Sequence, residues 1–231
     1  MLGLLFCAAA EPAGRAEAAS AGVVDEYLDR AAERLTPQAR DVLLRIRQTP
    51  RRLLALRAYL RAVNNLAERW SWSDAQVEAF MRSEEYSSLA AEIERVRETF
   101  EQRNPGYTLY ANTQVRTVNM QLQRWNENAG VARAGLHLHR AARAELLTGD
   151  YPAVPSDAAL ARFIQFLIAW RPPAAPPLAA PGLSLHGQSR AIDFQIVRAG
   201  RIIAGADIAS VRSIWEKQGW ARRLRDAVGS A

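Results

Sequence analysis

Residues 184–194 read Ser-Leu-His-Gly-Gln-Ser-Arg-Ala-Ile-Asp-Phe and join a proline-rich connector to an alternating, β-prone run. The stretch places His186 seven residues before Asp193. Imidazole and carboxylate groups bind zinc at about 2 Å, and a loop that leads into a strand can hold two such ligands close together. Most pairs at this spacing are an exposed histidine and a solvated or capping aspartate. The pair is therefore a candidate metal site, and the residues around it decide how strongly the pattern indicates metal binding.

The segment that contains Asp193 has the pattern of a strand. From residue 191 to residue 197 apolar and polar side chains alternate, which predicts a half-buried strand. Ala199-Gly200 then predicts a turn into a second strand over residues 201–204. Asp193 would project from the face opposite the apolar residues, toward a cleft.

The wider pattern is Ser184-x-His186-x4-Ala191-x-Asp193. It resembles the Ser-x-His-x-x-Gly-x-Ala-x-Asp signature of the zinc D-alanyl-D-alanine carboxypeptidases, the family of the vancomycin-resistance D,D-carboxypeptidases and related peptidoglycan peptidases. The resemblance implies that His186 and Asp193 bind zinc. One position differs, because Ser189 stands where the family usually has glycine. A backbone conformation that suits glycine must here be adopted by a residue with a Cβ atom.

A second segment, Arg116-Thr117-x3-Gln121, resembles the Tyr-Arg-Ser-x3-Gln segment of the same family. In that family a strand delivers the arginine to the active site and a helix carries the glutamine. A planar guanidinium can grip a carboxylate with two hydrogen bonds. The resemblance makes Arg116, Gln121 and Ser184 candidate substrate-binding residues. Val115 replaces the family's aromatic residue, and the alternative for Arg116 is an ordinary surface salt bridge.

The rest of the family's site is missing from the sequence. The family ends its site with Glu-x-x-His, which supplies the general base and the third zinc ligand. No histidine follows His186, and the only later glutamate is Glu216, inside an expected helix. A catalytic zinc needs three protein ligands, and a base contributes about 10²- to 10⁴-fold to the rate.

Three explanations for the missing segment remain open. The one we favour is that the chain stops before the last strands of the domain. The second is a degenerate relative that no longer catalyses. The third is that His137 or His139 supplies the missing ligand. Residues 131–147 favour a helix, on which residues two apart point in different directions, so these two histidines are expected on a solvated surface.

The 231 residues suit one domain with an appendage or two small domains. We expect a signal segment or disordered tail over residues 1–22, a helical region of four to five helices over 23–103, and a D,D-carboxypeptidase-like domain over 104–231 that is incomplete at its C-terminus. The expected fold class is α+β, with a small antiparallel sheet flanked by helices and preceded by an all-helical region. The metallopeptidase fold itself is implied by the resemblance.

Local signals predict where several helices and strands begin and end. Asn104-Pro105-Gly106 predicts a turn that ends the helical region, followed by a strand over residues 107–115 and a helix through Trp125. A helix from Asp207 should run to about Lys217. Helix-capping side chains are expected at Thr36, Thr49, Ser73, Ser156 and Asp207.

The composition restricts partners and location. The net charge is +6, but the arginines are interspersed with acidic residues, so we expect no nucleic-acid partner. The apolar run over residues 2–10 is too short to span a bilayer, which takes about 20 residues. An export signal there would place the protein in the periplasm or cell envelope, and a simple tail would leave it cytoplasmic. Cys7 is the only cysteine, which excludes an intrachain disulfide.

The sequence thus predicts a zinc metallopeptidase that hydrolyses a D-Ala-D-Ala or similar bond in peptidoglycan stem peptides. The alternative is a truncated or degenerate, non-catalytic relative that binds peptidoglycan or a protein partner.

Overall fold

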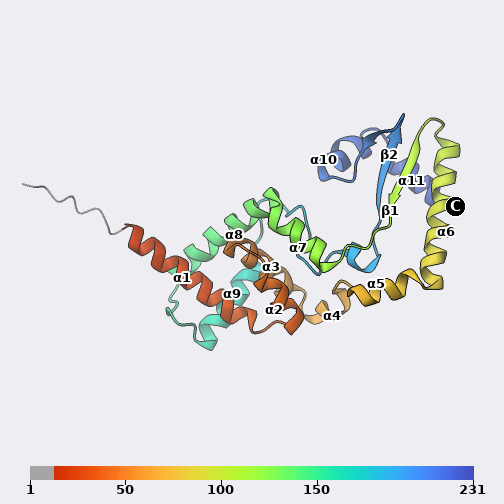
Figure 1. Cartoon of the computed structure of the whole chain (residues 1–231). Helices are drawn as coiled ribbons and strands as arrows, with labels where there is room; N and C mark the ends of the chain where they lie inside the picture. The colour runs from red at the N-terminus through yellow and green to blue at the C-terminus, as the bar shows by residue number, and fades with distance from the viewer. Residues whose placement is uncertain (1–12) are drawn as a thin grey trace, which may run out of the picture. The chain divides into compact units, whose positions relative to one another are not determined.

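The computed structural model describes residues 13–231. The apolar run over residues 2–10 and Cys7 lie outside the described residues, and so does the prediction of an export signal. The fold is α+β, with helices and one small antiparallel sheet of three strands, as expected (Figure 1). The chain forms two compact units, one from residues up to 66 with 122–180, and the other from residues 67–121 with 181–231. Each unit takes residues from both sides of Asn104, where the sequence analysis placed the start of the second domain.

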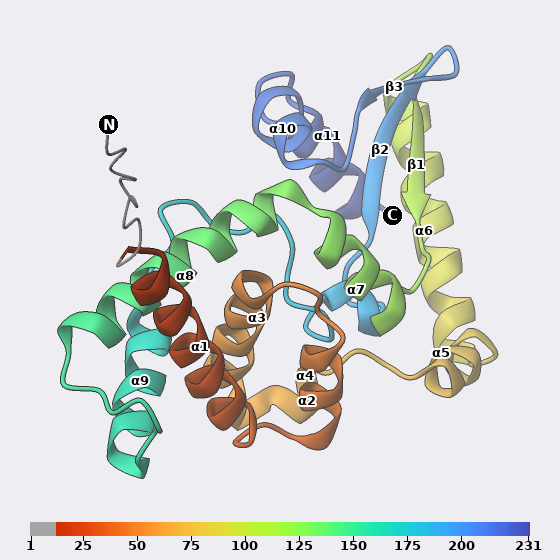
Figure 2. The ribbon, with the colours of Figure 1, turned by 60° about the vertical axis from the view of Figure 1, so that its left-hand side comes forward.

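Unit 1 is a helical bundle organised around α3. This helix packs against α1, α2, α8 and α9 and is buried along most of its length (Figure 2). A Cβ atom on Gly135 of α8 would lie 2.6 Å from the carbonyl oxygen of Pro50, so glycine permits the close approach of α8 to α3. The helices are α1 (Ala13–Ala32), α2 (Pro37–Leu44), α3 (Thr49–Arg61), the 3₁₀ turn η1 (Val63–Asn65), α8 (Ala129–Thr148) and α9 (Asp157–Ala169). Two further helices, α4 (Leu66–Arg69) and α7 (Val118–Glu127), have residues in both units.

Two buried arginines of α3 bind the ends of neighbouring helices. Arg51 donates to the backbone carbonyls of Trp125 and Asn128, and Arg57 donates to the carbonyl of Trp170 at 2.6 Å. The last carbonyls of a helix lack partners within the helix, so these guanidinium groups satisfy them. Burial lowers the pKa of Arg57 below its usual value, and the nearby Arg61 and Arg171 lower it further.

Most of the predicted caps are confirmed. Four of the five expected side chains accept a hydrogen bond from the first turn of their helix, and Ser73 makes both bonds of a capping box with Gln76. The prediction for Thr49 is wrong, because α3 already includes this residue and the capping position is Gln48. The hydroxyl of Thr49 instead donates to Asp25 at 2.7 Å, a partner that lies 24 residues away. The described chain has six α-helices before Asn104, more than the four to five expected, and α4 is a single turn.

Unit 2 contains the sheet, in the order β1-β2-β3 with both pairs antiparallel. The predicted turn at Gly106 is present, and the strand after it is shorter than the expected range 107–115. β1 and β2 pair with Thr108 opposite Val197 and Asn112 opposite Asp193. The elements are α5 (Asp74–Met81), α6 (Glu84–Arg103), β1 (Thr108–Asn112), the 3₁₀ turn η2 (Leu185–Gln188), β2 (Asp193–Arg198), β3 (Arg201–Ala204), α10 (Ile208–Ser210), the π-helical segment η3 (Val211–Trp215) and α11 (Trp220–Val228).

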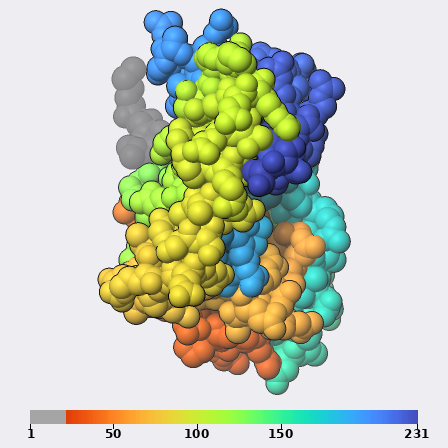
Figure 3. All heavy atoms as spheres, turned by 90° about the vertical axis from the view of Figure 1, so that its right-hand side faces the viewer, coloured from red at the N-terminus to blue at the C-terminus, as the bar shows by residue number. Residues whose placement is uncertain are grey.

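The core of unit 2 lies between the sheet and its helices. α6 packs along β1 and also contacts α11, and Figure 3 shows both helices at the surface of this unit. The core residues that these elements bury are Val96, Phe100, Leu109, Ile196, Ala204, Trp215, Trp220 and Ala227. The helix expected from Asp207 to Lys217 is realised as α10 followed by η3. Within residues 13–231, no helix is long and apolar enough to cross a membrane.

The turn between β2 and β3 provides a stability test. Ala199 has φ 47° and Gly200 has φ 74°, so both central residues adopt the left-handed conformation of a type I′ turn. Asparagine tolerates this conformation better than alanine, and a β-branched residue tolerates it worst. We expect Ala199→Asn to raise the free energy of unfolding by about 0.5 to 1 kcal/mol and Ala199→Val to lower it by about 1 kcal/mol or more, as measured by urea denaturation. Equal stability of the two variants would contradict the turn geometry.

Candidate functional site

Three residues singled out from the sequence come together in unit 2. Arg116 follows β1, His186 lies in η2, and Asp193 is the first residue of β2. Asp193 lies opposite the last residue of β1. The chain that continues from β1 to Arg116 therefore lies beside Asp193. The Arg116 backbone N–H donates to the carbonyl of His186 at 3.1 Å. Because of this pairing, the loop of His186 and the segment of Arg116 are held side by side.

The carboxylate of Asp193 lies between the two other side chains. Its Oδ2 accepts a hydrogen bond from Nη2 of Arg116, and its Oδ1 lies 3.6 Å from Nε2 of His186. All three side chains are largely shielded, with exposed fractions of 19%, 18% and 24% for Arg116, His186 and Asp193. A half-buried carboxylate with a guanidinium on one oxygen and an imidazole on the other forms a compact polar cluster.

The His186 and Asp193 pair can hold two corners of a zinc site. Tetrahedral ligands at about 2.0 to 2.1 Å from zinc stand roughly 3.3 Å from one another, close to the observed separation of Nε2 and Oδ1. Across residues 13–231, no three His, Cys, Asp or Glu side chains come near enough to hold a metal ion. The described residues therefore bring together two side chains that could bind zinc, one fewer than a catalytic zinc site needs.

His137 and His139 lie on α8, in the helix that the sequence predicted, and α8 belongs to unit 1 and not to the unit that contains His186. His137 is exposed and His139 is half-buried. Burial lowers the pKa of His139, Asp25 opposes this change, and Arg143 adds to it.

Gln121 is buried, and the hydrogen bonds of its side-chain amide hold segments of the site together. Its Nε2 donates to Oγ of Ser71 at 2.9 Å and to the carbonyl of Arg116 at 2.7 Å. Its Oε1 accepts from the backbone N–H of Gly182 at 2.9 Å. Both ends of the amide are thus used within the protein. Resemblance made Gln121 a candidate substrate-binding residue, and its observed contacts are those of a positioning residue for Arg116.

The loop of His186 is seated on the segment around Ser71. The backbone N–H of Trp72 donates to the carbonyl of Gly187 at 2.9 Å, and Gln188 donates to the carbonyls of Glu68 and Trp70. A Cβ atom on Gly187 would lie 2.0 Å from Oγ of Ser71, so only glycine fits there.

Ser189 adopts φ 54° and ψ 21°, a left-handed conformation of the kind that suits glycine, at the position where the family that the segment resembles usually has glycine. Non-glycine residues adopt this conformation at a cost, and such residues cluster at functional sites. Ser184 lies at the start of η2 with its side chain half-buried, and its carbonyl accepts from the N–H of Gly187 at 2.8 Å.

A hollow of about 320 Å³ opens beside Asp193. Glu216, at the end of η3, also lines it, together with Arg225 and apolar side chains that include Phe194 and Trp215. Glu216 was not predicted to belong to the site. It is the only glutamate after Asp193, and this is the one signal in the sequence that could have indicated it.

Comparisons of the chain with protein-family models, with curated proteins and with solved structures found no match.

The close approach at Gly187 predicts a strong effect of a single methyl group. Gly187→Ala would drive Cβ into Ser71 and the amide of Gln121, which should lower the free energy of unfolding by about 1 to 3 kcal/mol. The matched control is Ser189→Gly, two residues away, which relieves a left-handed backbone and should be neutral or stabilising by up to about 1 kcal/mol. Thermal unfolding of both variants checks the pair. A Gly187→Ala protein as stable as the parent would show that the loop is not seated on Ser71.

Proposed function

We propose that this chain is a zinc-dependent peptidase that acts on peptidoglycan stem peptides, in the manner of the D-alanyl-D-alanine carboxypeptidases. The observation that carries the proposal is the meeting of Arg116, His186 and Asp193. These residues belong to two sequence segments that separately resemble that family, and they lie within one polar cluster. The α+β fold with a small antiparallel sheet is consistent with it.

In this proposal His186 and Asp193 hold the metal. The guanidinium of Arg116 already donates a hydrogen bond to Oδ2 of Asp193, which would orient that carboxylate. A hydrogen bond of this kind to a ligand changes how strongly the ligand binds its metal. The remaining N–H groups of Arg116 are suited to the terminal carboxylate of a peptide. When bound, zinc would polarise the scissile carbonyl and lower the pKa of a bound water.

Glu216 is our candidate for the group that accepts a proton. It lines the same hollow as Asp193 and is exposed, so a substrate in the hollow could reach it. A general base must come within hydrogen-bond reach of the proton that it abstracts once the substrate is bound.

The alternative function is non-catalytic binding of peptidoglycan peptides or of a protein partner. The specific observation in its favour is that no three His, Cys, Asp or Glu side chains of the described residues come near enough to hold a metal ion, and that Arg116 already hydrogen-bonds to one oxygen of Asp193. The same hollow would then bind a peptide without cleaving it.

Zinc binding and release of free D-alanine test the proposal. The chain should bind zinc, and His186→Ala should weaken that binding by about 100-fold or more, measured by competition with a chromophoric chelator. With zinc, the parent should release D-alanine from a pentapeptide muropeptide, and EDTA should stop the release. His137→Ala is the matched control, because this exposed histidine lies in the other unit. Absence of zinc binding and of D-alanine release would refute the peptidase and leave the binding alternative.

Substitution of Glu216 separates proton transfer from metal binding. We expect Glu216→Gln to lower kcat by about 10²-fold or more and to leave the zinc affinity unchanged, because the amide keeps the shape but accepts no proton. Glu98→Gln, at an exposed position of α6, is the control for loss of one negative charge. Full activity of Glu216→Gln would mean that another group is the base.

A further inference from the structure

Arg57 is a buried cation whose hydrogen bonding is incomplete. It lies on α3 of unit 1, and only 7% of the residue is exposed. Its Nη2 donates to the carbonyl of Trp170, but its Nε–H is buried and has no partner within the described residues. A buried donor without an acceptor is costly, and more so when it is charged. An unsatisfied group of this kind therefore points to an acceptor that comes from outside the chain, such as a water molecule or an ion.

Arg51, the other buried arginine of α3, has a more complete set of contacts. Its Nε donates to Oε1 of Gln48 at 3.0 Å, and its Nη1 donates to the carbonyls of Trp125 and Asn128. Burial alone lowers its pKa, without a contribution from another charge. The two arginines share a helix and are equally buried, so the incomplete bonding of Arg57 comes from its own surroundings.

Two more guanidinium groups lie beside Arg57. Arg171 follows α9, and its Nη1 lies 3.5 Å from the carbonyl oxygen of Trp170 that also accepts from Arg57. Two guanidinium groups thus meet at one oxygen atom. Arg61 comes four residues after Arg57 on α3, one turn along the same face of the helix. Arg61 and Arg171 both lower the pKa of Arg57, as positive charges at close range do.

The cluster of Arg57, Arg61 and Arg171 carries an unbalanced positive charge. In the part of the chain that the structure describes, no acidic side chain forms a salt bridge with any of the three, and no acidic group shifts the pKa of Arg57. The free carbonyls at the end of a helix offer about half a negative charge, against three positive charges here. The ring of Trp170, 5.4 Å from the guanidinium of Arg57, attracts the cation but adds no charge. An anion is therefore the missing component.

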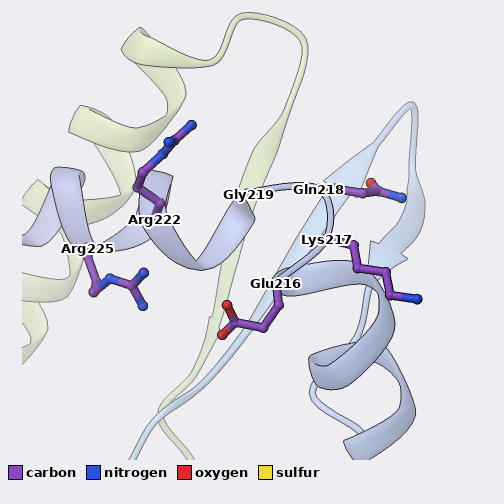
Figure 4. A pocket seen from close by; sticks show the side chains of 6 residues that line it. All are labelled: Glu216, Lys217, Gln218, Gly219, Arg222 and Arg225. Atoms are coloured by element: carbon purple, nitrogen blue, oxygen red, sulfur yellow. The ribbon is translucent and has the colours of Figure 1, made fainter.

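The cationic hollow of unit 2 lacks this convergence. It has a volume of about 370 Å³, and its lining includes Lys217, Arg222 and Arg225. Figure 4 shows Arg222 and Arg225 reaching to opposite sides of α11, and Lys217 pointing away from both. All three side chains are exposed, so water solvates their charges. Arg57 differs because its own charge is buried and two other guanidinium groups lie beside it.

We propose that Arg57, Arg61 and Arg171 form a binding site for a phosphate-type oxyanion. Arg61 and Arg171 are exposed and contact the anion, and the buried charge of Arg57 attracts it. A guanidinium binds phosphate oxygens through paired hydrogen bonds, and a phosphate dianion balances more of the positive charge than a carboxylate does. The site belongs to unit 1, whereas the residues of the proposed peptidase site belong to unit 2, so this inference does not depend on that function.

Inorganic phosphate is the first probe. Its dissociation constant for the whole chain is measured by calorimetric titration at constant ionic strength. We expect one phosphate to bind per chain, and Arg61→Gln/Arg171→Gln to weaken this binding by about tenfold or more, because two charge-assisted hydrogen bonds are lost. Both substituted side chains are exposed, so the variant should fold like the parent.

Arg57 is tested by a pair of substitutions. Arg57→Met removes the buried charge and should weaken phosphate binding, whereas Arg57→Lys keeps the charge and should retain most of it. Circular dichroism checks that both variants fold. Equal phosphate affinity of the two folded variants would overturn the role of the buried charge.

Vesicles separate a free phosphate ion from a phospholipid headgroup. The chain is sedimented with phosphatidylcholine vesicles that contain or lack phosphatidic acid. If the headgroup is the ligand, the chain sediments only with phosphatidic acid, and Arg61→Gln/Arg171→Gln does not. If the free ion is the ligand, phosphate binds in the titration and the chain sediments with neither vesicle.

The matched control is Arg133→Gln/Arg140→Gln, which removes two exposed arginines of α8 in the same unit. This variant should bind phosphate or vesicles as the parent does. The proposal is overturned if the parent binds neither probe, or if Arg61→Gln/Arg171→Gln binds them as tightly as the control.

Discussion

The buried amide of Gln121 joins three segments of unit 2 that are distant in the sequence. One end binds Ser71 and the carbonyl of Arg116, and the other end binds the N–H of Gly182. A buried amide left without partners costs about 1 to 3 kcal/mol per group, so these bonds form together or the site opens. The arrangement of Arg116 against the loop of His186 depends on this one side chain. The family resemblance made Gln121 a candidate substrate-binding residue. Its contacts instead support Arg116 and the loop of His186, which are themselves candidate site residues.

Asp193 shows how a small sheet can build a polar site. Its pairing with β1 sets its position, and its two oxygens face different partners, Arg116 and His186, which come from segments 77 and seven residues away. β2 pairs with β1 from Asp193 onward and with β3 over its second half, whereas the two partners of Asp193 come from outside the sheet. Rigid strand and braced loops together give a carboxylate with a defined orientation, which both a metal site and a peptide-binding site require.

Backbone constraints concentrate in the loop of His186. At Gly187 any side chain would collide with Ser71, while two residues later Ser189 carries a Cβ atom in a left-handed conformation. The first constraint holds the loop against its support, and the second turns the chain toward β2. Strain of this kind persists where the surroundings determine the conformation, and it often marks functional segments. The hollow beside Asp193 is lined by the start of β2, the strand that follows this loop.

Local signals in the sequence determined much of the secondary structure. The caps at Ser73 and Ser156, the turn at Gly106 and the β2–β3 hairpin follow from residues a few positions apart. The spacing of His186 and Asp193, and the resemblance of the residues around them to a known family, singled out these two side chains. Only the tertiary structure decided that Thr49 binds Asp25 rather than capping its helix, that Gln121 is used inside the protein, and that Glu216 and Arg225 share a hollow with Asp193. The reason is physical: a hydrogen bond or a cavity wall needs partners that are adjacent in space, and sequence separation says little about which distant residues the packed core will bring together.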